Sequence, residues 1–344
     1  GPVVAETKKH AFVVRAAWLE PGMAPYFGSI EYMRAQNFRE FVGALNRWGA
    51  PSENQVYADT KGNIGYKPAG RFPKRDNWDG LMPVPGDGRY EWDGYFDVDV
   101  LPEEYSPERG CSGTANAMSL PEDYPIDEYK VGFEWSAPWR YKRLWEFLDT
   151  PEPHSMEDSL ALQRDYHSVL TRRVLALLPE LAKTNPNSGG PLLTDWDQRL
   201  EADSAAAALW NVWYYRHLSP ALGRTLTKDG ETPAGSLDTQ TTLALLNTQQ
   251  GQAAAITSLR DAWAATSDLL GADASQWQWG DLHQIVFKHP LLDQANTSLA
   301  EHMRIKPYPR GGSANTTNNT GFGANSFDVR SGASFRMVVD VGNW

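Results

Sequence analysis

Hydrophobic and polar residues form different patterns along this chain, and these predict strands near both ends with helices between them. Residues 11–19 (AFVVRAAWL) have the β-branched and aromatic content of a mostly buried strand. Residues 37–48 have a helical period instead, with an apolar stripe at Phe38, Phe41, Val42, Leu45 and Trp48. Asn37 and Glu40 have capping-box spacing, so a helix cap is favoured over a functional role for Asn37.

A hairpin is predicted after this helix. Residues 55–59 (QVYAD) and 64–73 (IGYKPAGRFP) are rich in strand-forming residues, and they flank the turn Thr60-Lys61-Gly62-Asn63. Glycine at the tight position supplies the backbone conformation that a short hairpin turn requires. The two strands should therefore pair in antiparallel fashion.

Residues 71–109 are rich in Pro, Gly, Asp and aromatic residues, which predicts a long ordered loop. Burying its rings would hold this loop in place. The rings belong to Trp78, Tyr90, Trp92, Tyr95 and Phe96. A sugar-binding platform is the alternative interpretation of the same aromatic residues.

Residues 141–303 are predicted to be mainly helical. Apolar residues from Tyr141 to Leu148 repeat at helical spacing, and Ser155 with Asp158 caps the next helix. A Pro/Gly break at residues 185–191 separates these from further helices over 195–218 and 241–270. After them, residues 308–327 predict an Asn-rich surface loop, and residues 332–342 (GASFRMVVDVG) predict a buried strand.

Composition narrows the class of protein. The chain has 344 residues, of which 41% are hydrophobic and 22% charged, enough for a buried core and more than one subdomain. Its net charge of −11, without a long basic run, argues against nucleic acid and anionic membranes as partners. Cys111 is the single cysteine, so no intrachain disulfide can form. No apolar run reaches the length of a membrane span, and no leader opens the chain, so we expect any targeting signal to have been removed or to lie outside it.

The stretch from Gly110 to Arg140 contains the strongest candidate for chemistry. Small residues surround one amide side chain, Asn116, and Trp135 and Trp139 precede Arg140. Small neighbours let a ligand approach the backbone closely, and an asparagine there can direct an N–H group at a developing oxyanion. Asparagine in a Gly/Ser-rich stretch is more commonly a turn residue. Local chemistry therefore leaves both roles open.

Several segments, in order, resemble the penicillin amidase family of N-terminal-nucleophile hydrolases. GTANAMSLPEDYP, from residue 113, and FEWSAPWRYKRLWEFL, from residue 133, match the family's Thr-Ala-Asn, Tyr-Pro and Trp-x-x-Pro-x-Arg elements. Residues 62–75, 79–96, 279–291 and 332–342 agree as well. The resemblance covers most of the chain. It implies an α+β fold, with segments of the four-layer αββα hydrolase core and a large helical insertion.

The family's nucleophile is a Ser, Thr or Cys at the free N-terminus of its large subunit, where the terminal amine acts as the base. Gly1 and Pro2 stand at this position here, and neither has the required group. We therefore expect the chain to begin within the large subunit. Its partners would be the remaining segments of the same processed precursor: the small subunit and a Ser-initiated segment.

The resemblance also assigns roles to two residues of this chain. Asn116 matches the asparagine whose side-chain amide stabilises the oxyanion of the tetrahedral intermediate, and Arg140 matches an arginine beside it. Arg140 would orient the amide and keep the terminal amine neutral, hence basic. Without the resemblance, an ordinary structural arginine is the simpler interpretation.

No cofactor is required for this chemistry, but many family members bind a structural calcium ion near the Tyr-Pro segment. Asp127 and Glu128 lie close to the matching position, shifted by about one residue, and the resemblance makes them candidate calcium ligands. The other ligands would come from outside this chain.

His283 and His289 resemble a metal or general-base pair, but six residues apart they do not share a helix face. A packing role is favoured for both, and also for His167 and His217. Gly-rich phosphate loops, zinc-type cysteine pairs and His-Glu-x-x-His motifs are absent from the sequence.

The sequence thus predicts three regions: residues 1–140 as the sheet-rich part with the oxyanion segment, 141–305 as the helical region, and 306–344 as a loop and returning core strand. The implied function is hydrolysis of a linear amide, such as a penicillin or an acyl-homoserine lactone, with this chain alone inactive. The family is typically periplasmic or secreted. Two alternatives stay open: a carbohydrate-binding or glycoside-cleaving module, and a non-catalytic relative, because Ala117 stands where many members have a polar residue.

Overall fold

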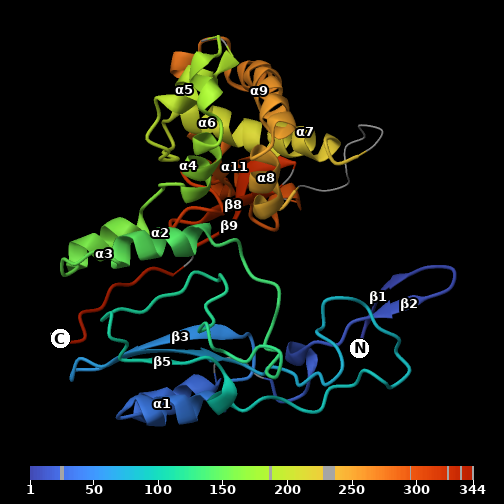
Figure 1. Cartoon of the computed structure of the whole chain (residues 1–344), viewed down its shortest axis with the longest axis vertical. Helices are drawn as coiled ribbons and strands as arrows, with labels where there is room; N and C mark the ends of the chain where they lie inside the picture. The colour runs from blue at the N-terminus through green and yellow to red at the C-terminus, as the bar shows by residue number, and fades with distance from the viewer. Residues whose placement is uncertain are drawn as a thin grey trace. The chain divides into compact units, whose positions relative to one another are not determined.

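The computed structural model describes residues 1–23, 27–185, 188–227, 237–294, 296–323, 325–333 and 335–342. The chain divides into two compact units (Figure 1). The first contains Gly1–Tyr141 and the described residues 339–342, and the second contains Lys142–Val338. Asn116 and Arg140 both lie in the first unit.

The first unit is built on short strands and one helix. A two-stranded antiparallel ribbon opens it, and a three-stranded antiparallel sheet of order β3-β4-β5 follows. In chain order the elements are β1 (Val3–Glu6), β2 (Ala11–Val13), the 3₁₀ helices η1 (Ala17–Leu19) and η2 (Phe27–Arg34), α1 (Phe38–Leu45), β3 (Glu53–Ala58), β4 (Ile64–Ala69), η3 (Val98–Val100) and β5 (Glu104–Tyr105).

The predicted cap and apolar stripe of α1 are confirmed. Asn37 Oδ1 accepts a hydrogen bond of 3.0 Å from the backbone N–H of Glu40, which satisfies one of the free donors at the helix start. The stripe packs against the β3–β4 hairpin, and all of its members are buried. This core contains Phe38, Phe41, Val42, Leu45, Trp48, Ala69, Val98 and Leu101. Figure 1 shows α1 lying along the β3–β5 sheet.

The hairpin prediction is also confirmed. β3 and β4 pair from Glu53↔Ala69 to Ala58↔Ile64, and Gly62 in the turn has φ +85°. A glycine tolerates this left-handed conformation because it has no Cβ. The long loop after β4 is ordered as expected, with Trp78 packed edge-on to Tyr90 at 6.4 Å and Trp92 to Tyr95 at 6.2 Å between ring centroids.

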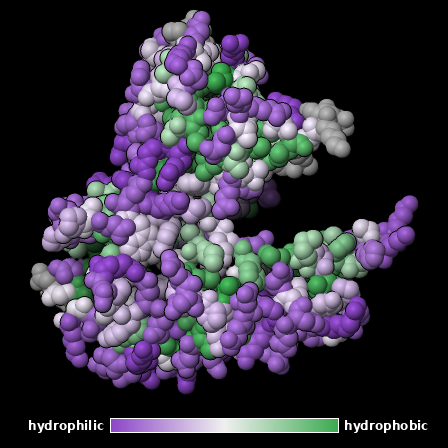
Figure 2. Space-filling model, viewed as in Figure 1, coloured by the Kyte–Doolittle hydropathy of each residue, from purple (hydrophilic) through white to green (hydrophobic). Residues whose placement is uncertain are grey.

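The predicted buried strand over residues 11–19 is wrong. Only Ala11–Val13 form a strand, and they are exposed, while Ala17–Leu19 form a 3₁₀ helix. Trp18 is 69% exposed. Strand propensity does not by itself bury a segment, because burial needs a second layer of side chains against it. In Figure 2, hydrophobic residues reach the surface in the region where β1 and β2 lie in Figure 1.

The second unit is mainly helical, as predicted. Its helices are α2 (Trp139–Leu148, which begins in the first unit), α3 (Met156–Gln163), α4 (Val169–Ala176), η4 (Pro179–Lys183), α5 (Gly190–Thr194), α6 (Ala205–Val212), the π-helix η6 (Trp213–Leu218), α7 (Ser219–Arg224), α8 (Thr239–Leu246), α9 (Gln249–Leu270), η7 (Ala274–Gln276), α10 (Trp279–Leu282), η8 (Leu292–Gln294) and α11 (Thr297–Met303).

Local sequence explains where several of these helices begin. Ser155 and Asp158 form the predicted capping box of α3. Ser168, Ser204 and Thr248 cap α4, α6 and α9 through their hydroxyl oxygens. The predicted break at 185–191 separates η4 from α5, although Pro186 and Asn187 lie outside the described residues. Large side chains on α6, η6 and α10 then fill the core, with Trp210, Trp213 and Trp279 at most 2% exposed.

A four-stranded sheet completes this unit, and it corrects the prediction for the last part of the chain. Its order is β7-β6-β9-β8, with β6 at Gln284–Ile285, β7 at Tyr308–Pro309, β8 at Thr320–Gly323 and β9 at Ser326–Gly332. The predicted Asn-rich loop therefore contains a hairpin. The described residues of the predicted strand beyond Gly332 lie in no strand, and Phe335 is 78% exposed; Ser334 lies outside the described residues. A strand needs a hydrogen-bonded neighbour, and no described strand pairs with this segment.

No helix among the described residues is both long enough and apolar enough to cross a bilayer.

Candidate active site

Asn116 lies in an irregular segment that a backbone hydrogen bond fixes in place. Its φ of +63° places it in the left-handed region, which asparagine tolerates better than most residues. Its carbonyl oxygen accepts a hydrogen bond of 3.0 Å from the backbone N–H of Ser136. This bond closes the chain between residues 116 and 136 into a loop, so the Trp-Arg segment returns to Asn116.

Arg140 contacts the Asn116 side chain directly. Arg140 Nη2 donates a hydrogen bond of 3.0 Å to Asn116 Oδ1. Because a guanidinium only donates, the amide oxygen must face Arg140, and the two N–H groups of Asn116 Nδ2 point elsewhere. Asn116 is exposed, so these donors are available to a ligand.

Arg140 is fixed by its place at the start of α2. Trp139, its neighbour, is 3% exposed and anchors the first turn. Burial lowers the pKa of Arg140 below its ordinary value, but the group stays charged in the neutral range. Among the described residues, Arg140 forms no ion pair with a carboxylate. Its side chain donates a hydrogen bond to Asn116 instead. Its positive charge therefore acts on the amide and on whatever binds beside it.

A chain of side-chain hydrogen bonds holds the other end of the Asn116 segment. The buried Tyr66, on β4, donates to Asn54 Oδ1 at 2.8 Å, and Asn54 Nδ2 donates to Thr114 Oγ1 at 2.9 Å. Ser119 Oγ lies 3.4 Å from Thr114 Oγ1 and donates to the carbonyl of Ala117 at 3.1 Å. These contacts tie both sides of Asn116 to the β3–β4 hairpin. Asn54 and Tyr66 were not singled out in the sequence, and Thr114 entered only as part of the Thr-Ala-Asn element. A hydrogen bond between residues 60 positions apart leaves no periodic signal.

Comparison with known proteins identifies the fold around this amide. A sequence model of the penicillin amidase family matches residues 1–344. The chain belongs to the penicillin amidase family. It is 28% identical to an acyl-homoserine lactone acylase QuiP of Pseudomonas fluorescens, over 90% of this chain and 41% of that protein. It is 28% identical to a penicillin acylase 2 proenzyme of a Pseudomonas species, over 90% of this chain and 42% of that protein.

The predicted α+β fold of the penicillin amidase family is confirmed by a solved structure. A thermostable penicillin G acylase from Alcaligenes faecalis matches with a TM-score of 0.60 and 21% identity, over 80% of this chain and 58% of that chain. The chain spans about two fifths of the length of the curated relatives, 41% of the first and 42% of the second.

The calcium ligands implied by the penicillin amidase resemblance do not form a complete site by themselves. Asp127 and Glu128 are exposed neighbours on one turn. A calcium ion takes six to eight oxygen ligands. The described residues contain no group of three or more His, Cys, Asp or Glu side chains arranged to hold a metal. The calcium site therefore stays a prediction that depends on ligands from elsewhere.

His283 and His289 have different surroundings in this member of the penicillin amidase family. His283 is fully buried, stacks on Trp279 at 4.7 Å between ring centroids, and contacts the Phe327 carbonyl through Nδ1 at 2.5 Å. His289 is exposed and accepts a local hydrogen bond from the backbone N–H of Leu291. These contacts fit the packing role expected for His283.

A cavity of about 510 Å³ lies in the first unit, and the sequence did not predict it. Trp18, Phe72, Trp92 and Val131 contribute apolar surface, and Arg15, Arg71 and Arg75 contribute charge. Arg15 stacks over Trp92 at 4.4 Å and pairs with Glu20 and Glu91. Ser52 also lines the cavity, two positions before Asn54 on the same backbone.

Proposed function

We propose that this chain supplies the oxyanion-stabilising amide of an acylase that hydrolyses linear amides. Membership of the penicillin amidase family supports the reaction class, since the relatives include acyl-homoserine lactone and penicillin acylases. The orientation of the Asn116 side chain supports its assignment as the oxyanion donor. Its oxygen is occupied by Arg140, and its N–H donors are exposed in a segment fixed at both ends.

In this proposal the nucleophile is a serine at the N-terminus of another segment. Its free amine removes the hydroxyl proton through a water molecule, and the oxygen attacks the acyl carbonyl. The negative charge that develops on the carbonyl oxygen is stabilised by Asn116 Nδ2 and by a backbone N–H from that other segment. Collapse of the tetrahedral intermediate breaks the C–N bond, and the protonated amine leaves. Water then hydrolyses the acyl-enzyme through a second oxyanion of the same geometry.

Arg140 is a positioning residue in this mechanism. Its hydrogen bond to Oδ1 polarises the amide, which makes the Nδ2 hydrogens better donors. Its charge also favours the neutral form of a nearby terminal amine, which is the form that acts as a base.

The cavity beside Ser52 is our candidate for part of the acyl-group site. Its volume is in the range of small-ligand pockets, and its aromatic walls suit an apolar acyl chain. The hydrogen bond from Asn54 to Thr114 connects the strand beside this cavity to the Asn116 segment. The acyl group would be that of a penicillin, an acyl-homoserine lactone or a related N-acyl compound, in a periplasmic or secreted enzyme.

The decisive experiment substitutes Asn116→Ala in the assembled enzyme that contains this chain and the nucleophile segment. Loss of the donor should lower kcat about 10²–10³-fold, with thermal unfolding unchanged. Release of nitroaniline from acyl-nitroanilides measures the rate. Asn77→Ala, which removes a surface amide that donates to the Arg89 carbonyl, is the matched control and should leave kcat unchanged. Equal turnover by Asn116→Ala and parent would reject the oxyanion role and favour a non-catalytic function.

The proposal also predicts that this chain alone releases no nitroaniline, because it assigns the nucleophile to another segment. Turnover by the purified chain would contradict the assignment of the nucleophile to another segment. A pull-down on polysaccharide tests the carbohydrate-binding alternative, and retention there would favour it.

A further inference from the structure

A cavity of about 470 Å³ in the second unit is lined by none of the residues assigned to catalysis. Three arginines, Arg164, Arg199 and Arg310, line it, together with Tyr166, Glu201, Ala161 and Asn318. Arginine presents a planar set of donors that matches carboxylate and phosphate oxygens. The charge balance around the cavity decides whether these donors are available.

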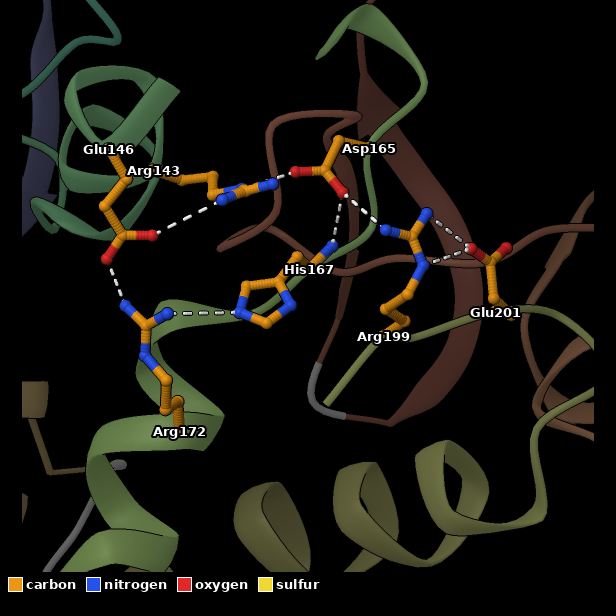
Figure 3. Close-up of polar contacts among 7 residues, drawn as sticks. All are labelled: Arg143, Glu146, Asp165, His167, Arg172, Arg199 and Glu201. Carbon is orange, nitrogen blue, oxygen red and sulfur yellow. Dashed lines mark hydrogen bonds and ion pairs between the residues drawn. The ribbon is translucent and has the colours of Figure 1, made fainter. Parts of the chain in front are cut away.

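Six charged residues, two of which line the cavity, neutralise one another (Figure 3). Asp165, at the centre of this group, is 5% exposed and pairs with Arg143 at 2.6 Å and Arg199 at 3.3 Å. The chain of ion pairs extends to Glu201 on one side and to Glu146 and Arg172 on the other. The three positive and three negative charges therefore balance, and the charge of Arg199 is neutralised by Asp165 and Glu201.

The remaining arginines at this cavity are not balanced in this way. In the part of the chain that the structure describes, Arg164 donates to the Leu160 carbonyl, and no ion pair joins Arg164 or Arg310 to a carboxylate. Arg336 joins them from the C-terminal segment by donating to Asn318 Oδ1 and to the Gln163 carbonyl. Its partners are neutral too. Arg164 and Arg310 thus line the cavity without a carboxylate partner, and Arg336 contacts Asn318, which also lines it.

Tyr166 also lines this cavity, and close packing fixes its ring. Its ring packs so closely on Gly311 and Gly312 that a Cβ at either glycine would lie within 2.8 Å of a ring carbon. Burial raises the pKa of Tyr166, the charges of Arg310 and Arg336 lower it, and the charge of Glu201 raises it. The neutral phenol keeps its O–H as a donor to an anion.

We infer that this cavity binds a small anion that carries at least two negative charges, such as a polycarboxylate or a phosphate. The volume excludes a macromolecular partner from the cavity itself and fits a ligand of a few heavy atoms. Two anionic groups would balance Arg164 and Arg310, the two arginines of the lining that have no carboxylate partner. This site is independent of the amide-hydrolysis proposal.

The test is isothermal titration calorimetry of this chain with citrate and, separately, with inorganic phosphate, at constant ionic strength set with sodium chloride. Constant ionic strength is needed because salt screens exposed charges. We expect saturable binding of at least one of the two probes. Binding of citrate alone identifies a polycarboxylate site, and binding of phosphate alone identifies a phosphate site.

Arg310→Gln should weaken that binding about tenfold or more, since it removes a charged donor without removing the polar end of the side chain. Arg173→Gln, at an exposed position of α4, removes the same charge elsewhere and should leave the affinity unchanged. Circular dichroism without the probe checks that both variants fold, and Arg164→Gln replaces Arg310→Gln if the latter does not. Absence of binding by both probes, or equal affinity of the parent and the folded variant, would overturn the inference.

Discussion

Arg140 Nη2 donates to Asn116 Oδ1 at 3.0 Å, although the two residues are 24 positions apart in the chain. The same loop is closed by a backbone hydrogen bond from Ser136 to Asn116. A side chain that accepts from a cation on one side and exposes two donors on the other can direct those donors at a developing negative charge. This pair is the basis of the proposed acylase function.

Removing the guanidinium should impair turnover more than substrate binding. We expect Arg140→Met in the assembled enzyme to lower kcat about tenfold or more, because the Asn116 amide loses its fixed orientation and its polarisation. KM should change less, and steady-state kinetics with an acyl-nitroanilide separates the two. Arg39→Met, at an exposed position of α1, is the control. A parent-like kcat for Arg140→Met would mean that Asn116 does not depend on Arg140.

The Thr114 hydroxyl should matter through the position of Asn116. Thr114→Val removes the acceptor for Asn54 while keeping the shape, and should cost about 1 kcal/mol of stability. In the assembled enzyme kcat should fall severalfold with KM nearly constant, and Thr114→Ser should restore it. If Asn116→Ala abolishes turnover but Thr114→Val does not change kcat, the network is structural only.

Asp165 should be the most sensitive charged residue of the second unit. Asp165→Ala leaves Arg143 and Arg199 without their shared, buried carboxylate, and we expect a loss of about 3–5 kcal/mol. Glu180→Gln breaks the exposed pair with Lys183 and should cost less than about 1 kcal/mol. Urea unfolding followed by circular dichroism measures both. Similar small losses for the two variants would show that the Asp165 pairs contribute little.

His283 should make the protein less stable in acid. Burial lowers its pKa from 6.5 to about 4, so between these values the unfolded chain binds a proton that the folded protein does not. The unfolding free energy is therefore unaffected by this titration above pH 6.5. It decreases as the pH falls towards 4, by up to about 1.4 kcal/mol per pH unit.

Replacing this ring tests that assignment. In His283→Gln, the decrease in unfolding free energy between pH 6.5 and pH 4 should be smaller than in the parent. His302→Gln, at an exposed position of α11, serves as the control. Parallel pH profiles for parent and His283→Gln would show that another group causes the acid sensitivity.

The elements that the sequence predicted correctly depend on neighbours in the chain. Asn37 caps α1 through the N–H three residues on, and Ser155 does the same for α3. The Gly62 turn likewise joins two adjacent strands. The residues that carry such structures lie within a few positions of one another, so a pattern records them.

The strands that the sequence misplaced depend on distant partners. Residues 11–19 and 332–342 have strand-like composition, yet most of their described residues are exposed. The less apolar residues 326–332 pair with β6 and β8 instead. Composition states that a residue can join a sheet, and only the neighbouring strand determines whether it does.

The sequence by itself determined the family, the α+β class and the choice of Asn116 and Arg140 as candidates, because these follow from ordered local motifs. Only the tertiary structure decided that Arg140 holds the amide oxygen, that Asn54 and Thr114 brace the segment, and that Arg164 and Arg310 line one cavity. The physical reason is the range of the interactions. Hydrogen bonds and charges act between atoms a few ångströms apart, and the folded backbone, rather than spacing in the chain, sets those distances.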